Sequence, residues 1–149
     1  MFQTNAKAET EGVWFKDDEE GVAMLICHRD NPKAKKLAQR YTAPYIQSFR
    51  KNSPQVFAVS EKIEAQVIAE AVWIGTKTRK KDGDDFEKWA DGVIPDAEGK
   101  PVACGTVDAR VALLKDENWR PMRELIESLM RDDTRYAPDA SKAGMIAGE

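Results

Sequence analysis

The first residues that could form a chemical site are Asp82-Gly83-Asp84-Asp85, which superficially match the start of a calcium-binding loop. If Asp82 were the first ligand, the turn glycine that such a loop requires would fall on Glu87. The bidentate glutamate would fall on Val93, so the ring of ligands cannot close. The sequence therefore predicts a solvated loop here and no metal site.

Cys27 and His28 form a second candidate pair, because a histidine beside a cysteine can generate a thiolate nucleophile. Neighbours on a strand point to opposite faces, however, and the sequence offers no third group that would orient the ring. The chain also contains no phosphate-binding loop, dinucleotide fingerprint or paired-cysteine zinc site. We therefore expect a protein that binds other proteins, with no catalytic residues, no cofactor and no enzymatic activity.

A basic segment from Arg29 to Lys51 carries a single acid, Asp30, and places Tyr41, Tyr45 and Phe49 at four-residue intervals. Basic residues interleaved with aromatic ones can bind nucleic acid. Aromatic residues at helical spacing are more often core, and a run of charge is usually the solvated face of the same helix. With a net charge of -3 for the whole chain, nucleic-acid binding is the less favoured interpretation.

Length and composition indicate the kind of protein that carries these residues. A chain of 149 residues with 42% hydrophobic content suits one domain around one core. Two cysteines without repeated spacing are typical of a reduced, cytosolic compartment. The N-terminus lacks the apolar stretch of a signal peptide, and the longest apolar run, Val22 to Cys27, is far too short to cross a bilayer. We expect a single globular domain over residues 10–132, a flexible N-terminus over 1–9, a disordered tail over 133–149 and no membrane association.

Local patterns predict a β-hairpin over about residues 12–28, with an acidic, glycine-containing turn between two apolar strands. A helix should follow, with Asn31 as its N-cap and Pro32 at its first position. Pro44 must kink or split that helix.

The clearest helix is predicted from Ser60, an N-cap, to Gly75, which closes it. Its apolar residues form two stripes, so more of its circumference is apolar than a surface helix requires. The stripes consist of Ile63, Val67, Ala71 and Ile74, and of Ala65, Ile68, Ala69 and Val72. We expect this helix to lie at the centre of the core or in an interface.

The second half of the chain begins with a charged loop, predicted over residues 77–85. Residues 86–104 contain two turn signals and predict extended chain or a second small hairpin. Thr106 should cap a helix that runs to Leu114. A last helix should carry Trp119, Met122, Ile126 and Leu129 on one face. The fold class predicted from these elements is α+β, predominantly α, with an N-terminal hairpin followed by a compact group of helices.

The order of these elements resembles the tail assembly chaperones of long-tailed, siphovirus-like bacteriophages. The elements that carry the resemblance are the opening hairpin Glu11 to Arg29, the basic segment Asn31 to Leu37, the apolar helix around Ile63 to Ile74, the motif Trp89-Ala90-Asp91-Gly92-Val93, the turn Asp96 to Pro101, and the closing helices Val107 to Leu114 and Trp119 to Met130. The resemblance covers about residues 10 to 132. The basic loop at Lys77 to Lys81 departs from the pattern as an apparent insertion.

The resemblance implies a non-enzymatic factor that acts in the host cell cytoplasm during virion morphogenesis and is absent from the mature virion. Such a factor keeps the tape measure protein soluble, recruits tail tube subunits and can self-associate weakly along its client. A tape measure is a long helical protein with apolar faces, so its chaperone needs apolar grooves for helices. The candidate partner-binding residues are Ile63, Val67, Ile68, Ala71, Val72 and Ile74, with Trp119, Met122 and Met130 second.

Two alternatives stay open at this point. A structural head-tail connector or minor tail protein would share the phage context but remain in the particle. A small nucleic-acid-binding regulatory protein would use the basic segment described above.

Overall fold

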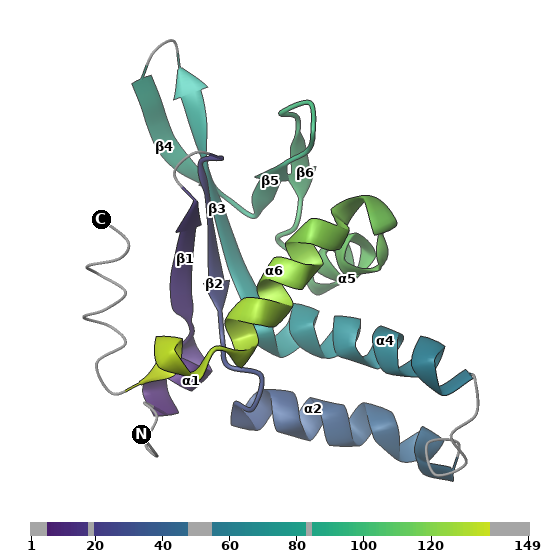
Figure 1. Ribbon diagram of the computed structural model, residues 1–149. Coiled ribbons are helices and arrows are strands. Elements are labelled where there is room, and N and C mark those ends of the chain that lie inside the picture. Colours follow the sequence, from purple (N-terminus) through teal and green to yellow (C-terminus); the bar gives the residue numbers. More distant parts are fainter. Residues whose placement is uncertain (1–5, 18–19, 48–54, 83–84, 138–149) are drawn as a thin grey trace.

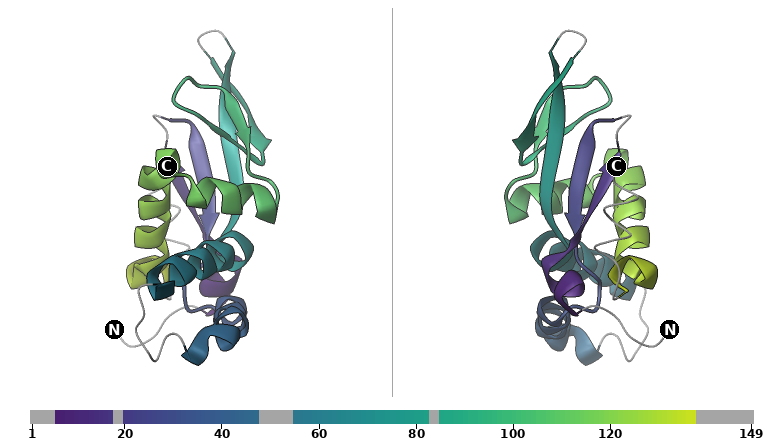
Figure 2. Two further views of the ribbon diagram at one scale, coloured as in Figure 1. Left: turned by 90° about the vertical axis from the view of Figure 1, so that its right-hand side faces the viewer. Right: turned by 90° about the vertical axis from the view of Figure 1, so that its left-hand side faces the viewer.

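The computed structural model describes residues 6–17, 20–47, 55–82 and 85–137. Within this part of the chain, a four-stranded antiparallel sheet in the order β1-β2-β3-β4 packs against helices. Its strands are β1 (Val13–Asp17), β2 (Val22–Ile26), β3 (Trp73–Asp82) and β4 (Asp85–Asp91). The β3–β4 hairpin projects at one end of the molecule, and α2 (Pro32–Thr42) lies at the opposite end (Figures 1 and 2). The α+β class and the N-terminal hairpin are confirmed, although the sheet is larger than the predicted hairpin because β3 and β4 extend it.

The two faces of the sheet differ because side chains alternate along each strand. One face carries Phe15, Met24 and Ile26 into the core cluster. The other face carries Trp14, whose ring lies across the neighbouring strands so that Lys77 Nζ is 5.2 Å from its centroid. Gly75 lies beneath this ring, and a Cβ there would touch the Trp14 side chain at 3.5 Å and press on Leu25 Cβ at 3.3 Å.

Helix α2 begins as its sequence predicts. The Asn31 side chain accepts a hydrogen bond from the Ala34 amide, and Pro32 occupies the first turn, where no backbone donor is needed. The helix ends at Thr42, and a short 3₁₀ turn, η1 (Ala43–Tyr45), contains Pro44. The predicted split at this proline is therefore confirmed.

Helix α4 (Gln55–Val67) runs into a π-helical turn, η2 (Ile68–Val72), and both of its predicted ends are wrong. Ser60 lies inside the helix and does not cap it, because the apolar period already begins with Val59, four residues before Ile63. The helix stops before Gly75 because Trp73 pairs with Ile26 of β2. Ile74 is consequently a strand residue and does not continue the helical stripe.

The charged segment after this helix forms a strand where a loop was predicted. Residues from Lys77 to Asp82 belong to β3, because this strand pairs with β2 and buries Thr76 and Thr78 on the core face beside Met24 and Val22. Residues 83–84 of the predicted loop lie outside the described part. The predicted second hairpin is confirmed as β5 (Val93–Pro95) and β6 (Pro101–Ala103).

The closing helices are α5 (Val107–Lys115), capped by Thr106, and α6 (Arg120–Arg131), preceded by the 3₁₀ turn η3 (Glu117–Trp119). The tail predicted from residue 133 is wrong at its start, because Asp133–Tyr136 forms the 3₁₀ turn η4 and Tyr136 is fully buried. The flexible N-terminus predicted over 1–9 is likewise wrong for residues 6–9, which belong to the short helix α1 (Ala6–Glu11). Residues 1–5 and 138–149 lie outside the described part.

A polar junction fixes η4 against the end of β2. The Tyr136 hydroxyl donates to the Ile26 carbonyl at 3.0 Å, and its ring meets the His28 ring edge to face with centroids 4.9 Å apart. His28 Nδ1 accepts from the Asp30 amide at 3.0 Å, so Nε2 carries the proton and donates to Asp133 Oδ1 at 2.7 Å. Segments more than 100 residues apart are thereby joined.

Candidate partner-binding grooves

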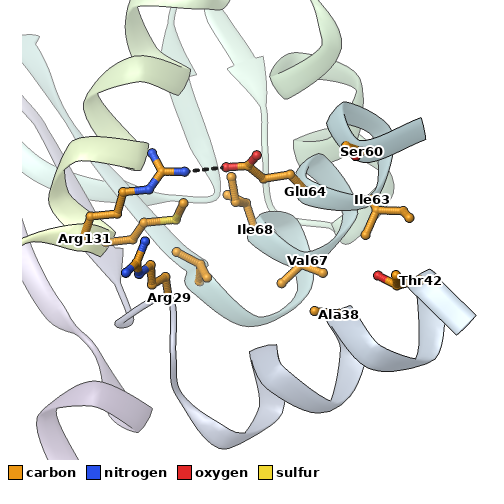
Figure 3. Close-up of a pocket in the computed structure, with 11 residues that line it drawn as sticks. Arg29, Ala38, Thr42, Ser60, Ile63, Glu64, Val67, Ile68 and Arg131 are labelled. Atoms are coloured by element: carbon orange, nitrogen blue, oxygen red, sulfur yellow. Dashed lines mark hydrogen bonds and ion pairs between the residues drawn. The ribbon is translucent and has the colours of Figure 1, made fainter. Parts of the chain in front are cut away.

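An apolar groove runs between α2 and α4 and encloses about 310 Å³. We call it the α2–α4 groove. Figure 3 shows Ile63 and Val67 on one wall opposite Ala38 and Thr42 on the other. The complete lining consists of Arg29, Ala38, Thr42, Ser60, Ile63, Glu64, Val67, Ile68, Val72, Met130 and Arg131.

Helical periodicity places these side chains. Ile63 and Val67 are four residues apart on α4, and Ala38 and Thr42 are four apart on α2, so each pair lies on one face of its helix. The small side chain of Ala38 leaves space in front of the larger residues of α4.

The π-helical turn η2 contributes the floor of the groove through Ile68 and Val72. Buried side chains from other elements hold its backbone carbonyls. Arg110 Nε donates to the Ala69 carbonyl at 3.0 Å, and Asn31 Nδ2 donates to the Ala71 carbonyl at 3.0 Å. The floor is therefore fixed by the fold, whereas the groove above it is open.

Large exposed apolar residues lie near the start of α4 and just after the end of α2. Phe57 lies seven residues before Glu64 on α4 and is 74% exposed. Tyr45 and Ile46 follow Thr42 by three and four residues and are 43% and 44% exposed. These three account for most of the large apolar side chains that the described residues expose, and a cluster of this kind is typical of an interaction surface.

A second apolar groove of about 340 Å³ lies where the core face of the hairpin meets the start of α6. We call it the Trp119 groove. Its rim carries the acids Asp17 and Glu20. The apolar part of its lining consists of Phe15, Val22, Met24, Ile94, Pro95, Trp119, Pro121, Met122 and Leu125.

A third cavity, about 550 Å³, separates α4 from α5 and α6 and is lined mostly by charged residues. Several of these charges form ion pairs, such as Arg120 with Glu117. Arg123 donates to Glu127 at 2.9 Å and to the carbonyls of Leu114 and Glu61. Polar atoms make up a larger share of the surface of this cavity than of the two grooves, so it is less suited to an apolar partner.

The predicted binding residues separate into three groups. Ile63, Val67, Ile68, Val72 and Met130 meet in the α2–α4 groove, and Trp119 and Met122 meet in the Trp119 groove. Ala71 lines neither groove and is buried in the core, where its carbonyl accepts from Asn31 Nδ2. Ile74 lies apart from the other residues on β3 and is partly exposed there.

Sequence reasoning missed the α2 wall of the groove. In the basic segment the sequence draws attention to the aromatic residues. Of these, Tyr41 donates its hydroxyl to Glu70 of η2, and Phe49 lies outside the described part. The pair Ala38 and Thr42, small residues four apart on a basic helix, was the available signal.

The Cys27–His28 pair does not form a reactive centre. The Cys27 thiol donates to the Thr10 carbonyl at 3.2 Å, while His28 bonds Asp133. Burial raises the pKa of Cys27 from its ordinary 9.0 to about 11, against the lowering effect of Lys33. Because the thiol stays protonated near neutral pH, it is a poor nucleophile. An orienting acid for His28, which the sequence did not reveal, exists in Asp133, and its role here is to hold the polar junction together.

Among the described residues, no group of three or more histidine, cysteine or acidic side chains has the arrangement of a metal site. No helix in that part of the chain is long and apolar enough to span a membrane. No family model, curated protein or solved structure matches the chain.

Proposed function

We propose that this chain is a bacteriophage tail assembly chaperone that binds helical segments of the tape measure protein in the α2–α4 groove. The observation that supports this proposal is the groove itself, an apolar channel between two helices, together with exposed Phe57, Tyr45 and Ile46 near the ends of those helices. Amphipathic helices bind such channels through apolar anchors spaced three and four residues apart. The resemblance of the sequence to tail assembly chaperones supplies the identity of the client.

The volume of the groove favours a protein segment over a small ligand. About 310 Å³ is at the lower limit of pockets that hold drug-sized molecules. A helix laid along the groove needs to insert only one row of side chains, and the rest of its surface stays outside. The exposed residues beyond the groove then add contact area without deepening it.

In this proposal the protein acts in the host cell cytoplasm, recruits tail tube subunits to the coated tape measure and leaves before the virion matures. The Trp119 groove is available for the tail tube contact. Mass spectrometry of purified virions distinguishes this role from that of a head-tail connector or minor tail protein. The protein should be absent, and a stoichiometric amount would favour the structural alternative.

Co-expression with the tape measure protein of the same phage tests the client assignment. The wild-type chain should keep the tape measure in the supernatant, and the Ile63→Glu variant should lose this effect because a carboxylate would be desolvated in the groove. Ile74→Glu is the matched control, since it makes the same change at a partly exposed site on β3. Equal tape-measure solubility with Ile63→Glu and wild type would contradict the proposed site, and no effect of the wild type would contradict the function.

A further inference from the structure

The α2 side of the groove is strongly basic. Helix α2 contains Lys33, Lys35, Lys36 and Arg40 and no acidic residue. Lys35 precedes Ala38 by three residues and Thr42 by seven, so it lies on the face of α2 that borders the groove. Its side chain is exposed to solvent at that border.

The inner end of the groove carries two arginines, and its one acid is already engaged. Arg29 and Arg131 line this end together with Glu64, the sole acid among the lining residues (Figure 3). Arg131 Nη2 lies 3.0 Å from Glu64 Oε1, and Arg131 Nη1 lies 3.5 Å from Glu127. Glu64 is thus neutralised by Arg131. Arg29 Nε lies 3.6 Å from Asp30 Oδ2 and is the more weakly paired of the two arginines, so the positive charge left for a partner lies mainly along α2.

This positive charge is local. The whole chain carries a net charge of -3, and the Trp119 groove is bordered by Asp17 and Glu20. An acidic partner would therefore be attracted to one groove and repelled by the other. Exposed charges at a binding site contribute to specificity and to the rate of association more than to affinity.

We infer that the occupant of the α2–α4 groove is an amphipathic helix with acidic residues beside its apolar stripe. The apolar stripe fills the groove between Ile63, Val67 and Ala38, and its acidic flank faces Lys35 and Arg29. Helix α4 spans about 20 Å over its 13 residues at roughly 1.5 Å per residue, so the docked segment needs about four turns. Because this inference rests on the proposed function, its test must separate charge preference from helix binding itself.

Two synthetic helical peptides of about 15 residues provide the probes for this test. Both carry leucines at positions i, i+3, i+4, i+7 and i+11, and their flanking residues are glutamate in one and lysine in the other. Fluorescence anisotropy measures the dissociation constant of each peptide with the full chain at low and at high salt. The glutamate-flanked peptide should bind about tenfold more tightly at low salt, and the preference should shrink at 0.3 M salt because exposed charges are screened.

The double variant Arg29→Glu/Lys35→Glu should abolish or reverse this preference. Lys16→Glu/Lys100→Glu is the matched control, because both lysines are exposed, lie away from the groove and give the same change in net charge. Far-UV circular dichroism verifies that both double variants fold. A preference retained by the first double variant, or lost equally by the control, overturns the inference.

The remaining outcomes distinguish the inference from the proposed function. Equal binding of both peptides, abolished by Ile63→Glu, refutes the acidic flank and leaves helix binding in place. Binding of neither peptide refutes the inference, and the tape-measure co-expression then decides the function separately. Concentration-dependent dimerisation that Ile63→Glu abolishes and neither peptide inhibits would show that the groove serves a second copy of the chain, and this too overturns the inference.

Discussion

Tyr136 is the residue whose replacement we expect to cost the most stability outside the central core. Its side chain is fully buried, its ring packs on His28 and its hydroxyl donates to the Ile26 carbonyl. Replacing a buried large aromatic residue by alanine removes its transfer free energy and leaves a cavity, with a typical loss of about 3–5 kcal/mol. With a urea m-value of about 2 kcal/mol/M, Tyr136→Ala should lower the unfolding midpoint by about 2 M.

Urea unfolding followed by circular dichroism measures this loss. Tyr136→Phe keeps the ring and removes the hydrogen bond, so it should lower the free energy of unfolding by about 1 kcal/mol. This variant should stay folded and measurable even if Tyr136→Ala does not fold. Tyr45→Ala is the matched control, because Tyr45 is exposed and a surface substitution typically changes stability by about 0.5 kcal/mol or less. If Tyr136→Ala unfolded at the same urea concentration as Tyr45→Ala, residues 133–136 would lie outside the folded domain. The disordered tail predicted from the sequence would then be correct.

Two further predictions concern buried polar groups. Arg110→Met removes donors from the carbonyls of Ala69 and Cys104 and should cost about 3 kcal/mol by thermal or urea unfolding, because buried acceptors are left unpaired. Arg120→Met, on the surface, should be nearly neutral, and similar losses in both variants would contradict this role. The raised pKa of Cys27 makes the unfolded chain lose its thiol proton near pH 9, while the folded chain keeps it up to about pH 11. The stability of the wild type should therefore fall more steeply than that of Cys27→Ala between pH 9 and pH 11, whereas parallel melting curves over that range would refute the burial of an ionisable thiol.

Features set by a few neighbouring residues were predictable from the sequence. Asn31 and Thr106 cap their helices because each bonds an amide three residues away, and Pro44 interrupts a helix through its own ring. The N-terminal hairpin follows the same logic, since its strands pair directly across their connecting turn. In these cases all interacting atoms lie within one short segment.

Features decided by distant segments were not predictable. The residues around Ile74 fit a helical stripe, but pairing of Trp73 with β2 makes this segment a strand. The residues after Asp132 have no helical or strand period, yet Tyr136 is buried because β2 supplies its acceptor. The groove combines both cases. Its α4 wall is predictable from the apolar stripe in the sequence, whereas its α2 wall depends on how α2 packs against α4.

The polar junction at the end of β2 has a consequence for how the chain folds as it is synthesised. Its bonds join residues separated by 105 and 110 positions, so the nascent hairpin cannot make them until η4 has left the ribosome. Contacts between such distant residues typically slow folding, because a long loop must close first. Until then the carbonyl of Ile26 and the ring of His28 stay hydrated. Helices α2 and α4, which pack against each other locally, are thus able to form before the sheet end is sealed, whereas the groove between them is complete only when Met130 and Arg131 of α6 have joined its lining.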